Sequence, residues 1–362
     1  MKTWIRVATF VAFIGLAASA SAAVRKEIHI PDIAGYRTLK CDFHMHTVFS
    51  DGNVWPTVRV DEAWREGLDA IAITDHIEYQ PHKKDIPTNF ARSYEIALPR
   101  AKELNVLLIR ACELTHNTPP GHYNALFVKD IAALDIKDFL EQMKAANAQG
   151  AFVFWNHPGW KQKADESYWF DIHKTLVDQK LIQGIEPFNG DQYYKDAHTW
   201  AGQYNLTLVG NSDEHAPFDP PTENNANHRT MTLVFAKDRS LDGVHEALKS
   251  GRTAVWALNR LAGKEEFLKP LFEASVEFCP VFHRSGETAS LEVRNKFDVP
   301  FELARKGAGK SAKPLLLEPN STTILHATVN KETGKAEINY EVRNLLIEPG
   351  KGLPITVSIS AP

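Results

Sequence analysis

Between Tyr36 and about Trp256, short apolar runs alternate with longer amphipathic runs, and this alternation constrains the fold more than any other feature of the chain. The apolar runs predict strands at residues 38–43, 70–74, 106–112, 125–128, 151–155, 184–187, 207–210 and 232–235. Amphipathic runs at 56–66, 91–104, 136–148, 196–204 and 241–250 predict helices between them. Strand, helix and strand repeated in this way are typical of a parallel sheet. Seven or eight such units in roughly 220 residues favour a closed α/β barrel over an open sheet.

The segment after about Lys264 has a different pattern. Helical periodicity ends there, and short alternating runs follow at residues 290–293, 301–304, 323–329, 336–342 and 355–359. Turn residues separate these runs, which is typical of a small antiparallel β-sandwich. We therefore expect a barrel over residues 24–262 and a β-sandwich over residues 263–362.

The N-terminal residues have the pattern of a secretory signal peptide. Lys2 and Arg6 precede an apolar run at residues 7–16, and Ala20-Ser21-Ala22 is a small-residue cleavage pattern. The apolar run is about half the ~20 residues that a membrane span needs. We therefore expect residues 1–23 to be removed and the mature protein to be secreted into a periplasm.

Composition excludes some functions. The formal net charge of −4 does not suit a surface that neutralises the phosphates of duplex nucleic acid. The chain has three cysteines, an odd number, and Cys41 and Cys112 stand inside apolar runs, so buried thiols are expected rather than a disulfide framework. No Gly-x-Gly-x-x-Gly follows a strand, and no Gly-x-Ser-x-Gly motif provides a nucleophile.

Imidazoles and carboxylates recur where the predicted strands end. The candidates are His44, His46, Asp51, Asp75, His76, Glu113, His122, His157, Asp213 and His215. Because the carboxyl ends of barrel strands meet at one rim, residues far apart in sequence would converge there. His122 is the exception, since it precedes a strand. Mixed imidazole and carboxylate ligands suit Zn²⁺, Mn²⁺ or Fe²⁺. Six histidines are too many for one ion with an open position, so the pattern predicts a multinuclear metallohydrolase.

Spacing supports this interpretation. His44 and His46 alternate by two at a strand end, which points both side chains the same way, and Asp213 and His215 repeat that spacing. Glu113 ends a very apolar strand, where a carboxylate needs a cation or several donors. Its two oxygens could bridge two ions. His116 and His122 both follow Glu113, and we favour His122 as the ligand.

The order His-x-His, Ser-Asp-Gly, Thr-Asp-His, Glu, His, Asn-His-Pro and Ser-Asp-x-His resembles the polymerase and histidinol phosphatase (PHP) superfamily. The resemblance spans Lys40 to about Trp256. It implies a distorted (β/α)₇ barrel that carries two or three divalent ions and hydrolyses phosphate esters, typically monoesters. The secretion signal is unlike the cytoplasmic histidinol phosphatases and polymerase modules, so those specific roles do not transfer.

The resemblance also implies three metal sites. His44, His46, Glu113 and Asp213 would hold the first ion, Glu113, His122 and His157 the second, and Asp51, His76 and His215 the third. Asp75 would orient a ligand or take a proton. The Pro119-Pro120-Gly121 loop before His122 departs from the family pattern.

These assignments predict hydrolysis of a small phosphorylated substrate, such as a nucleotide or sugar phosphate, by a metal-activated hydroxide. Asp213 or Asp75 would shuttle protons, and His215 or His157 would assist the leaving oxygen. Arg229 is the first candidate for binding phosphate, with Lys161 and Lys163 weaker.

Three other functions remain open at this point. They are phosphodiester hydrolysis, amidohydrolase-like C–N or C–O hydrolysis, and a metal-stabilised binding module. An amidohydrolase usually carries a carbamylated lysine, and no lysine ends a strand among the candidate ligands. A module that only binds a partner would not need the complete set of candidate ligands.

Overall fold

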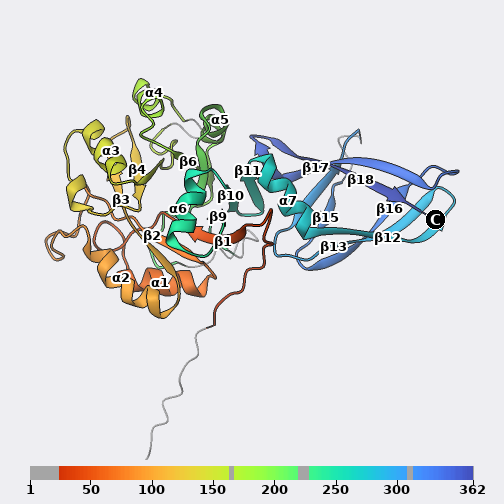
Figure 1. Ribbon diagram of the computed structural model, residues 1–362, viewed down its shortest axis with the longest axis horizontal. Coiled ribbons are helices and arrows are strands. Elements are labelled where there is room, and N and C mark those ends of the chain that lie inside the picture. The colour runs from red at the N-terminus through yellow and green to blue at the C-terminus, as the bar shows by residue number, and fades with distance from the viewer. Residues whose placement is uncertain (1–23, 163–166, 219–227, 308–312, 362) are drawn as a thin grey trace, which may run out of the picture.

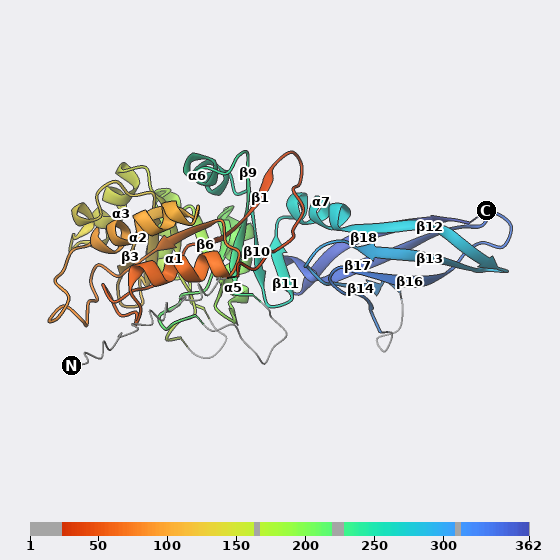
Figure 2. The same cartoon turned by 90° about the horizontal axis from the view of Figure 1, so that it is seen from below.

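The computed structural model describes residues 24–162, 167–218, 228–307 and 313–361, which form two lobes lying end to end (Figure 1). The predicted signal peptide and Lys163 lie outside these residues. The first lobe is a distorted α/β barrel, and the second is an elongated antiparallel β domain that extends away from it (Figure 2). Among the described residues, no helix combines the length and apolar character needed to cross a membrane.

The first three barrel strands are parallel and built as expected. They are β1 (Arg37–Asp42), β2 (Ala70–Ile73) and β3 (Leu107–Thr115), connected by α1 (Pro56–Arg65) and α2 (Arg92–Glu103). All four residues of β2 are buried, as in a strand covered on both faces. Pro56 opens α1 at a position where its missing N–H costs no helical hydrogen bond.

The next strand departs from the expected parallel order. β4 (His122–Leu126) runs antiparallel to both β3 and β5 (Phe152–Trp155). The connection from β3 to β4 covers only residues 116–121, and a parallel neighbour would need a crossover of about a dozen residues or more. A short 3₁₀ turn, η1 (Ala132–Leu134), and α3 (Phe139–Ala148) then lead to β5.

The remaining barrel elements complete the ring. They are α4 (Asp171–Asp178), β6 (Gly184–Asn189), β7 (Gln192–Tyr193), α5 (Lys195–Tyr204), β8 (Thr207–Asn211), β9 (Met231–Ala236), α6 (Leu241–Lys249) and β10 (Thr253–Ala257). β8 pairs parallel with β6, whereas β9 is antiparallel to β1 and to β10.

Threonine hydroxyls join β8 to the strands across from it. Thr232 Oγ1 donates to the Gly210 carbonyl and accepts from the Gly210 N–H, both at 2.9 Å, and Thr253 Oγ1 donates to the Leu208 carbonyl at 2.6 Å. Gly210 permits this approach, because a Cβ there would lie 2.2 Å from Val255 Cγ1. The barrel is therefore closed here partly by side chains, which accounts for its distortion.

The sheet of the barrel continues into the second lobe. β11 (Arg260–Gly263) pairs with β10 on one side and, in parallel, with β17 (Lys335–Glu348) on the other. β14 (Phe301–Arg305), β15 (Leu315–Leu317) and β18 (Lys351–Ser360) extend that sheet. A second sheet contains β12 (Val276–Ser285), β13 (Thr288–Asn295) and β16 (Ser321–Thr328). The domain boundary expected at residues 262 and 263 falls within β11.

One helix contradicts the expectation that helical periodicity ends near Lys264. α7 (Glu265–Ser275) lies at the junction of the lobes and buries Phe267, Leu268, Leu271 and Phe272. These four residues lie on one face, since they are spaced by one and four positions. Pro270 stands inside the helix and masks it in the sequence, because proline removes a backbone donor and usually breaks a helix.

Candidate metal centre

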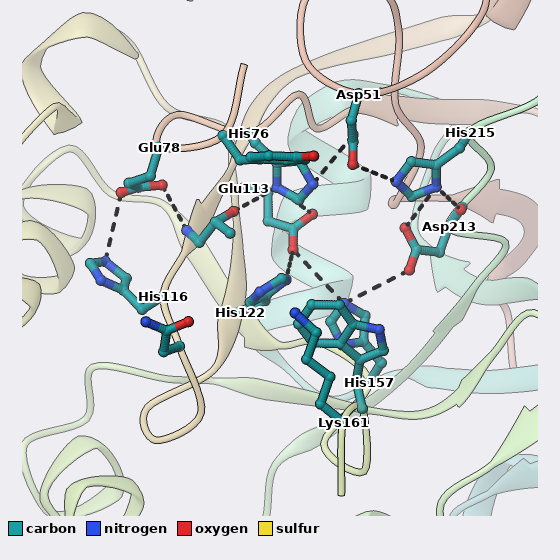
Figure 3. A pocket seen from close by; sticks show the side chains of 14 residues that line it. Asp51, His76, Glu78, Glu113, His116, His122, His157, Lys161, Asp213 and His215 are labelled. Carbon is teal, nitrogen blue, oxygen red and sulfur yellow. Dashed lines mark hydrogen bonds and ion pairs between the residues drawn. The ribbon is translucent and has the colours of Figure 1, made fainter. Parts of the chain in front are cut away.

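The candidate ligands converge on one rim of the barrel (Figure 3). His44 and His46 follow β1, His76 follows β2, Glu113 lies in β3, His157 follows β5, and Asp213 and His215 follow β8. His122 joins them because β4 runs antiparallel, which brings its first residue to the edge where the parallel strands end. A cavity of about 770 Å³ opens over this rim. The direction of β4 thus resolves the exception noted in the sequence.

Glu113 lies at the centre of the cluster and is fully buried. Its Oε1 lies 2.8 Å from His122 Nδ1 and 3.8 Å from His157 Nε2. Its Oε2 lies 2.9 Å from His44 Nε2, 3.2 Å from His46 Nε2 and 3.5 Å from His76 Nδ1. The two oxygens therefore face different sets of imidazoles, which is the arrangement of a carboxylate that can bridge cations.

A first group contains His44, His46 and Asp213. Both Nε2 atoms lie 3.1 Å from the same oxygen, Asp213 Oδ1. Two imidazole nitrogens and a carboxylate oxygen that converge in this way form a ligand set for Zn²⁺ or a similar ion. This is the geometry expected from the two-residue spacing of His44 and His46.

A second group contains Asp51, His76, His215 and His46. Asp51 Oδ1 lies 3.4 Å from His76 Nε2, and Asp51 Oδ2 lies 3.3 Å from His215 Nε2. His215 Nδ1 donates to the Asp213 carbonyl at 2.8 Å, which leaves its Nε2 as the acceptor directed at a cation. His46 stacks between His76 and His215, with centroid distances of 4.4 and 4.2 Å.

A third group forms around Glu113 Oε1, His122 and His157. Glu113 Oε1 and His122 Nδ1 are both buried without a hydrogen-bond partner although they lie 2.8 Å apart. Buried polar atoms without a hydrogen-bond partner are costly, and a cation beside these two atoms would offset that cost. Glu113 also groups with His44 and His157, and with His76 and His122. The expected second set is therefore divided, because His122 and His157 fall in separate potential ligand groups that share Glu113.

Comparison with known proteins agrees with this geometry. Residues 42–212 match the PHP domain family, and residues 276–358 match the Ig-like domain family DUF5001. The uncharacterised protein MJ1295 of Methanocaldococcus jannaschii is 37% identical over 195 residues, which are 50% of this chain and 84% of that protein. The chain belongs to the PHP family.

A solved structure resembles both lobes of this PHP protein. It is a two-domain protein from Bacteroides vulgatus containing a predicted PHP-like metal-dependent phosphoesterase. The two chains are 42% identical, the match covers 93% of this chain and 100% of that one, and the TM-score is 0.89. The PHP barrel and the Ig-like domain therefore occur together in a solved relative.

The electrostatics of the PHP site favour cations. Burial by itself lowers the pKa of His46, but hydrogen bonds that its ring donates to Asp213 and Glu113, together with the charges of these carboxylates, outweigh burial and raise the pKa to about 9. Burial would raise the pKa of Glu113, yet the imidazoles around it, His76 and His44 first, hold that pKa well below its usual range. Burial lowers the pKa of His157 to about 3. The ionised carboxylates thus attract either protons or metal ions.

Asp75 holds a turn and does not line the cavity. It accepts from the Thr47 N–H and Thr47 Oγ1, both at 2.7 Å, and from Ser50 Oγ at 2.8 Å. These bonds hold the turn that carries Asp51. Of the two roles expected for Asp75, the geometry supports orienting a ligand. It does not support proton transfer at the substrate, because Asp75 does not line the cavity.

Arg229 does not reach the cavity, which corrects its expected role in binding phosphate. Its side chain is fully buried, and its Nη1 donates to Asp42 Oδ2 at 3.1 Å. Asp42 also accepts from the backbone N–H and the hydroxyl of Ser212, the residue before Asp213. A buried carboxylate needs a counter-charge, and Arg229 supplies it. Lys161 does line the cavity, with its Nζ 3.9 Å from the centre of the Trp160 ring.

Two supporting residues escaped the sequence analysis. Glu186 in β6 is fully buried and accepts from the His157 N–H, Asn189 Nδ2 and Asn211 Nδ2, each at 2.9 Å. Its Oε1 also lies 3.4 Å from His44 Nδ1. A carboxylate inside an apolar strand was the signal that singled out Glu113, and it would have identified Glu186 as well.

Arg59 is the second missed residue, a fully buried arginine on α1. Its guanidinium donates to the carbonyls of His46, Glu214 and Ala216 at 2.9, 2.9 and 2.8 Å. Arg59 therefore ties together the two loops that carry His46 and His215. The polar face of an amphipathic helix gave no sign of this role, because an arginine there is ordinarily solvated.

Proposed function

We propose that this protein hydrolyses phosphate monoesters of small molecules with the help of two or three divalent metal ions. The observation that carries the proposal is the placement of Glu113, whose two oxygens face separate imidazole sets at the floor of an open cavity. The relative from Bacteroides vulgatus supports it, since that protein contains a predicted PHP-like metal-dependent phosphoesterase.

The proximity of the candidate ligands supports an assignment to three ions. We assign His44, His46, Glu113 and Asp213 to one ion, Glu113, His122 and His157 to a second, and Asp51, His76 and His215 to a third. Bound divalent ions would lower the pKa of water and offset negative charge on phosphoryl oxygens. Both ring nitrogens of His215 are engaged, by Asp213 and Asp51, so a ligand role suits it better than protonation of the leaving oxygen.

The rest of the cavity wall would position the ester. Lys161 lines the cavity, and its ammonium can pair with a phosphoryl oxygen. Trp160 lies over the same side, with its ring 4.6 Å from His122 and 5.5 Å from His157. Asp75, Glu186 and Arg59 would keep the ligand-bearing loops in place, so little reorganisation accompanies binding.

Phosphate release by the mature protein tests the proposal. The protein is loaded with Mn²⁺ or Zn²⁺ and assayed on 4-nitrophenyl phosphate, on nucleotide and sugar monophosphates, and on bis(4-nitrophenyl) phosphate. Release from monoesters that is lost in Asp213→Ala and His44→Ala is the expected result. Asp178→Ala, at an exposed position on α4, is the matched control. Bound metal with no release from any ester would reject the proposal, and release from the diester alone would support a phosphodiesterase.

We further propose that residues 1–23 direct export and that the mature protein acts in the periplasm. The charged start, the apolar run and the small-residue cleavage pattern support this. N-terminal sequencing of the protein from separated cell fractions tests it. A periplasmic chain that begins near Val24 is expected, whereas a cytoplasmic chain that keeps Lys2 and Arg6 would contradict it.

A further inference from the structure

A second polar cluster borders the metal-type ligands in the same cavity. Glu78 and His116 line the cavity, and Gln142 lies behind them on α3, fully buried. Gln142 Nε2 donates to Glu78 Oε1 at 2.5 Å and to the Leu134 carbonyl at 2.8 Å, while its Oε1 accepts from His116 Nε2 at 2.7 Å. A buried amide with both ends engaged in this way holds two cavity-lining side chains in place.

The bonds of Gln142 define what the cluster presents to a ligand. Because its Nε2 faces two acceptors, its oxygen faces His116, and His116 Nε2 must therefore carry the hydrogen. A neutral His116 then has Nδ1 as an acceptor. Glu78 Oε2 accepts the Thr115 N–H at 2.7 Å, so both carboxylate oxygens are held while each keeps a free lone pair. The cluster thus offers acceptors.

This cluster is separate from the metal-type groups, although it shares their cavity. Figure 3 shows Glu78 and His116 on one side of Glu113 and His122, with Asp213 and His215 on the other. Neither residue belongs to a group of potential metal ligands among the described residues. The side chains of Glu78 and His116 are 27% and 19% exposed, so a ligand can reach them. Thr115 connects them to the centre, since its Oγ1 lies 2.5 Å from His76 Nδ1.

We infer that Glu78 and His116 bind the alcohol portion of the substrate and select a phosphate ester with several hydroxyl groups, such as a sugar phosphate. The inference rests on the proposed function. Glu78 and His116 line the same cavity and are held by one amide, Gln142, so neighbouring hydroxyls of one ligand can donate to the Glu78 carboxylate and to His116 Nδ1. A site built to bond a hydroxyl discriminates against a substrate without one, because that substrate covers the free acceptor positions of Glu78 and His116 without bonding to them.

The test compares Glu78→Gln and His116→Phe with the wild type on three substrates. These are a pentose phosphate, 4-nitrophenyl phosphate, which has no hydroxyl on its ring, and phosphoethanolamine, which offers an ammonium. The ratio of kcat/KM for the sugar phosphate to that for 4-nitrophenyl phosphate is expected to fall about 10- to 100-fold in each variant, as for a lost hydrogen bond to a charged group. His116→Phe keeps a ring against Phe139, whose centroid is 5.1 Å away.

Each alternative outcome is distinct. Glu95→Gln, an exposed change on α2, should leave the ratio unaltered. An unaltered ratio in Glu78→Gln and His116→Phe, or equal losses on all three substrates, overturns the inference. A larger loss on phosphoethanolamine than on the sugar phosphate overturns the assignment to hydroxyl groups. Metal content measured in the same preparations distinguishes a change confined to the cavity wall from a loss of metal binding. No release by the metal-loaded wild type rejects the proposed function itself.

Discussion

At the scale of single residues, two buried carboxylates in apolar strands have different surroundings. Glu113 is surrounded by imidazoles and has an oxygen without a hydrogen-bond partner, whereas Glu186 accepts from three N–H donors. Burying a carboxylate is costly in both places, and hydrogen bonds offset the cost at Glu186, whereas Glu113 needs a cation beside it. Glu113 is therefore suited to bind metal, and Glu186 to orient the residues that do.

Replacing Glu113 tests its bridging role. Glu113→Gln should remove at least one ion per chain and lower phosphate release at least about 100-fold, because an amide can no longer supply two anionic oxygens. Elemental analysis of the purified protein gives the metal content. Glu103→Gln, on the exposed side of α2, is the control. Full metal content in Glu113→Gln would contradict a bridging role.

Replacing Glu186 tests orientation without removing a ligand. In Glu186→Gln, the amide NH₂ group replaces one of the carboxylate oxygens that accept hydrogen bonds from N–H donors. Because two donors then face each other, His44 and His157 should lose their fixed positions. Metal affinity should fall about 10- to 100-fold, as is usual when the partner of a ligand is lost. Competition with a chelator dye measures this fall. Affinity equal to that of the wild type would show that Glu186 serves stability alone.

At the scale of elements, the turn after β1 places Asp51. The Gly52 N–H closes the turn by donating to the Thr47 carbonyl at 2.9 Å, and the Asp75 carboxylate accepts from the Thr47 N–H. A Cβ on Gly52 would lie 2.5 Å from the His46 carbonyl carbon, closer than real contacts allow. The turn can therefore take this shape only with glycine at that position.

Gly52→Ala should displace Asp51 and weaken the site of Asp51, His76 and His215. We expect loss of about one ion per chain and a stability loss of roughly 1–3 kcal/mol, as for overpacking. Gly202→Ala is the control, since a Cβ there meets nothing within 4 Å and α5 should gain slightly from alanine. Metal content and thermal unfolding report the two effects. An unaltered metal content would show that the turn accommodates the methyl group.

Helix α4 contributes a pH-dependent contact. Burial lowers the pKa of His173 to about 4. In the folded protein its Nε2 donates to the Pro120 carbonyl and its Nδ1 accepts from the Phe170 N–H. Between about pH 6.5 and 4 the unfolded chain binds a proton that the folded chain does not, so stability falls as the pH falls.

Between pH 6.5 and 4, the titration of His173 lowers the free energy of unfolding by at most roughly 3 kcal/mol. His173→Gln should remove this share of the acid sensitivity, and denaturant unfolding at pH 7 and pH 4 in the presence of chelator measures it. Glutamine does not titrate, so the difference between the two pH values should be smaller in the variant than in the wild type. Parallel losses in both proteins would contradict the assignment.

At the scale of the whole molecule, the two lobes share a sheet and a core. Leu261 and Ala262 of β11 pair with Leu345 and Leu346 of β17, and one hydrophobic cluster includes Met45 of the barrel and Phe301 of the β domain. We therefore expect the barrel and the β domain to unfold together.

Metal removal tests this coupling. A chelator should lower the midpoint of one calorimetric transition that covers both lobes, because an ion bound only to the folded state stabilises all that unfolds with it. A free metal concentration 1,000 times Kd stabilises the folded state by about 4 kcal/mol. Circular dichroism and tryptophan fluorescence should report the same midpoint. Two transitions, with only one moved by the chelator, would show that the lobes are independent.

The sequence by itself determined the α/β order, the β domain and the candidate ligands at the strand ends. These follow from local patterns: apolar periodicity, the two-residue alternation of His44 and His46, and the rule that parallel strands end at one rim. The structure brings those candidate ligands together, and the family match accounts for the resemblance. Pro270 hid α7 because its local effect opposes the helical pattern around it.

Only the tertiary structure decided the rest. The direction of β4, which brings His122 to the rim, depends on pairing with both of its neighbours. Arg229 turns inward because Asp42, distant in the sequence, is buried beside it, and Glu186 gathers donors from three separate segments. Such contacts join residues far apart along the chain, and a local pattern carries no information about which buried charge will find which partner.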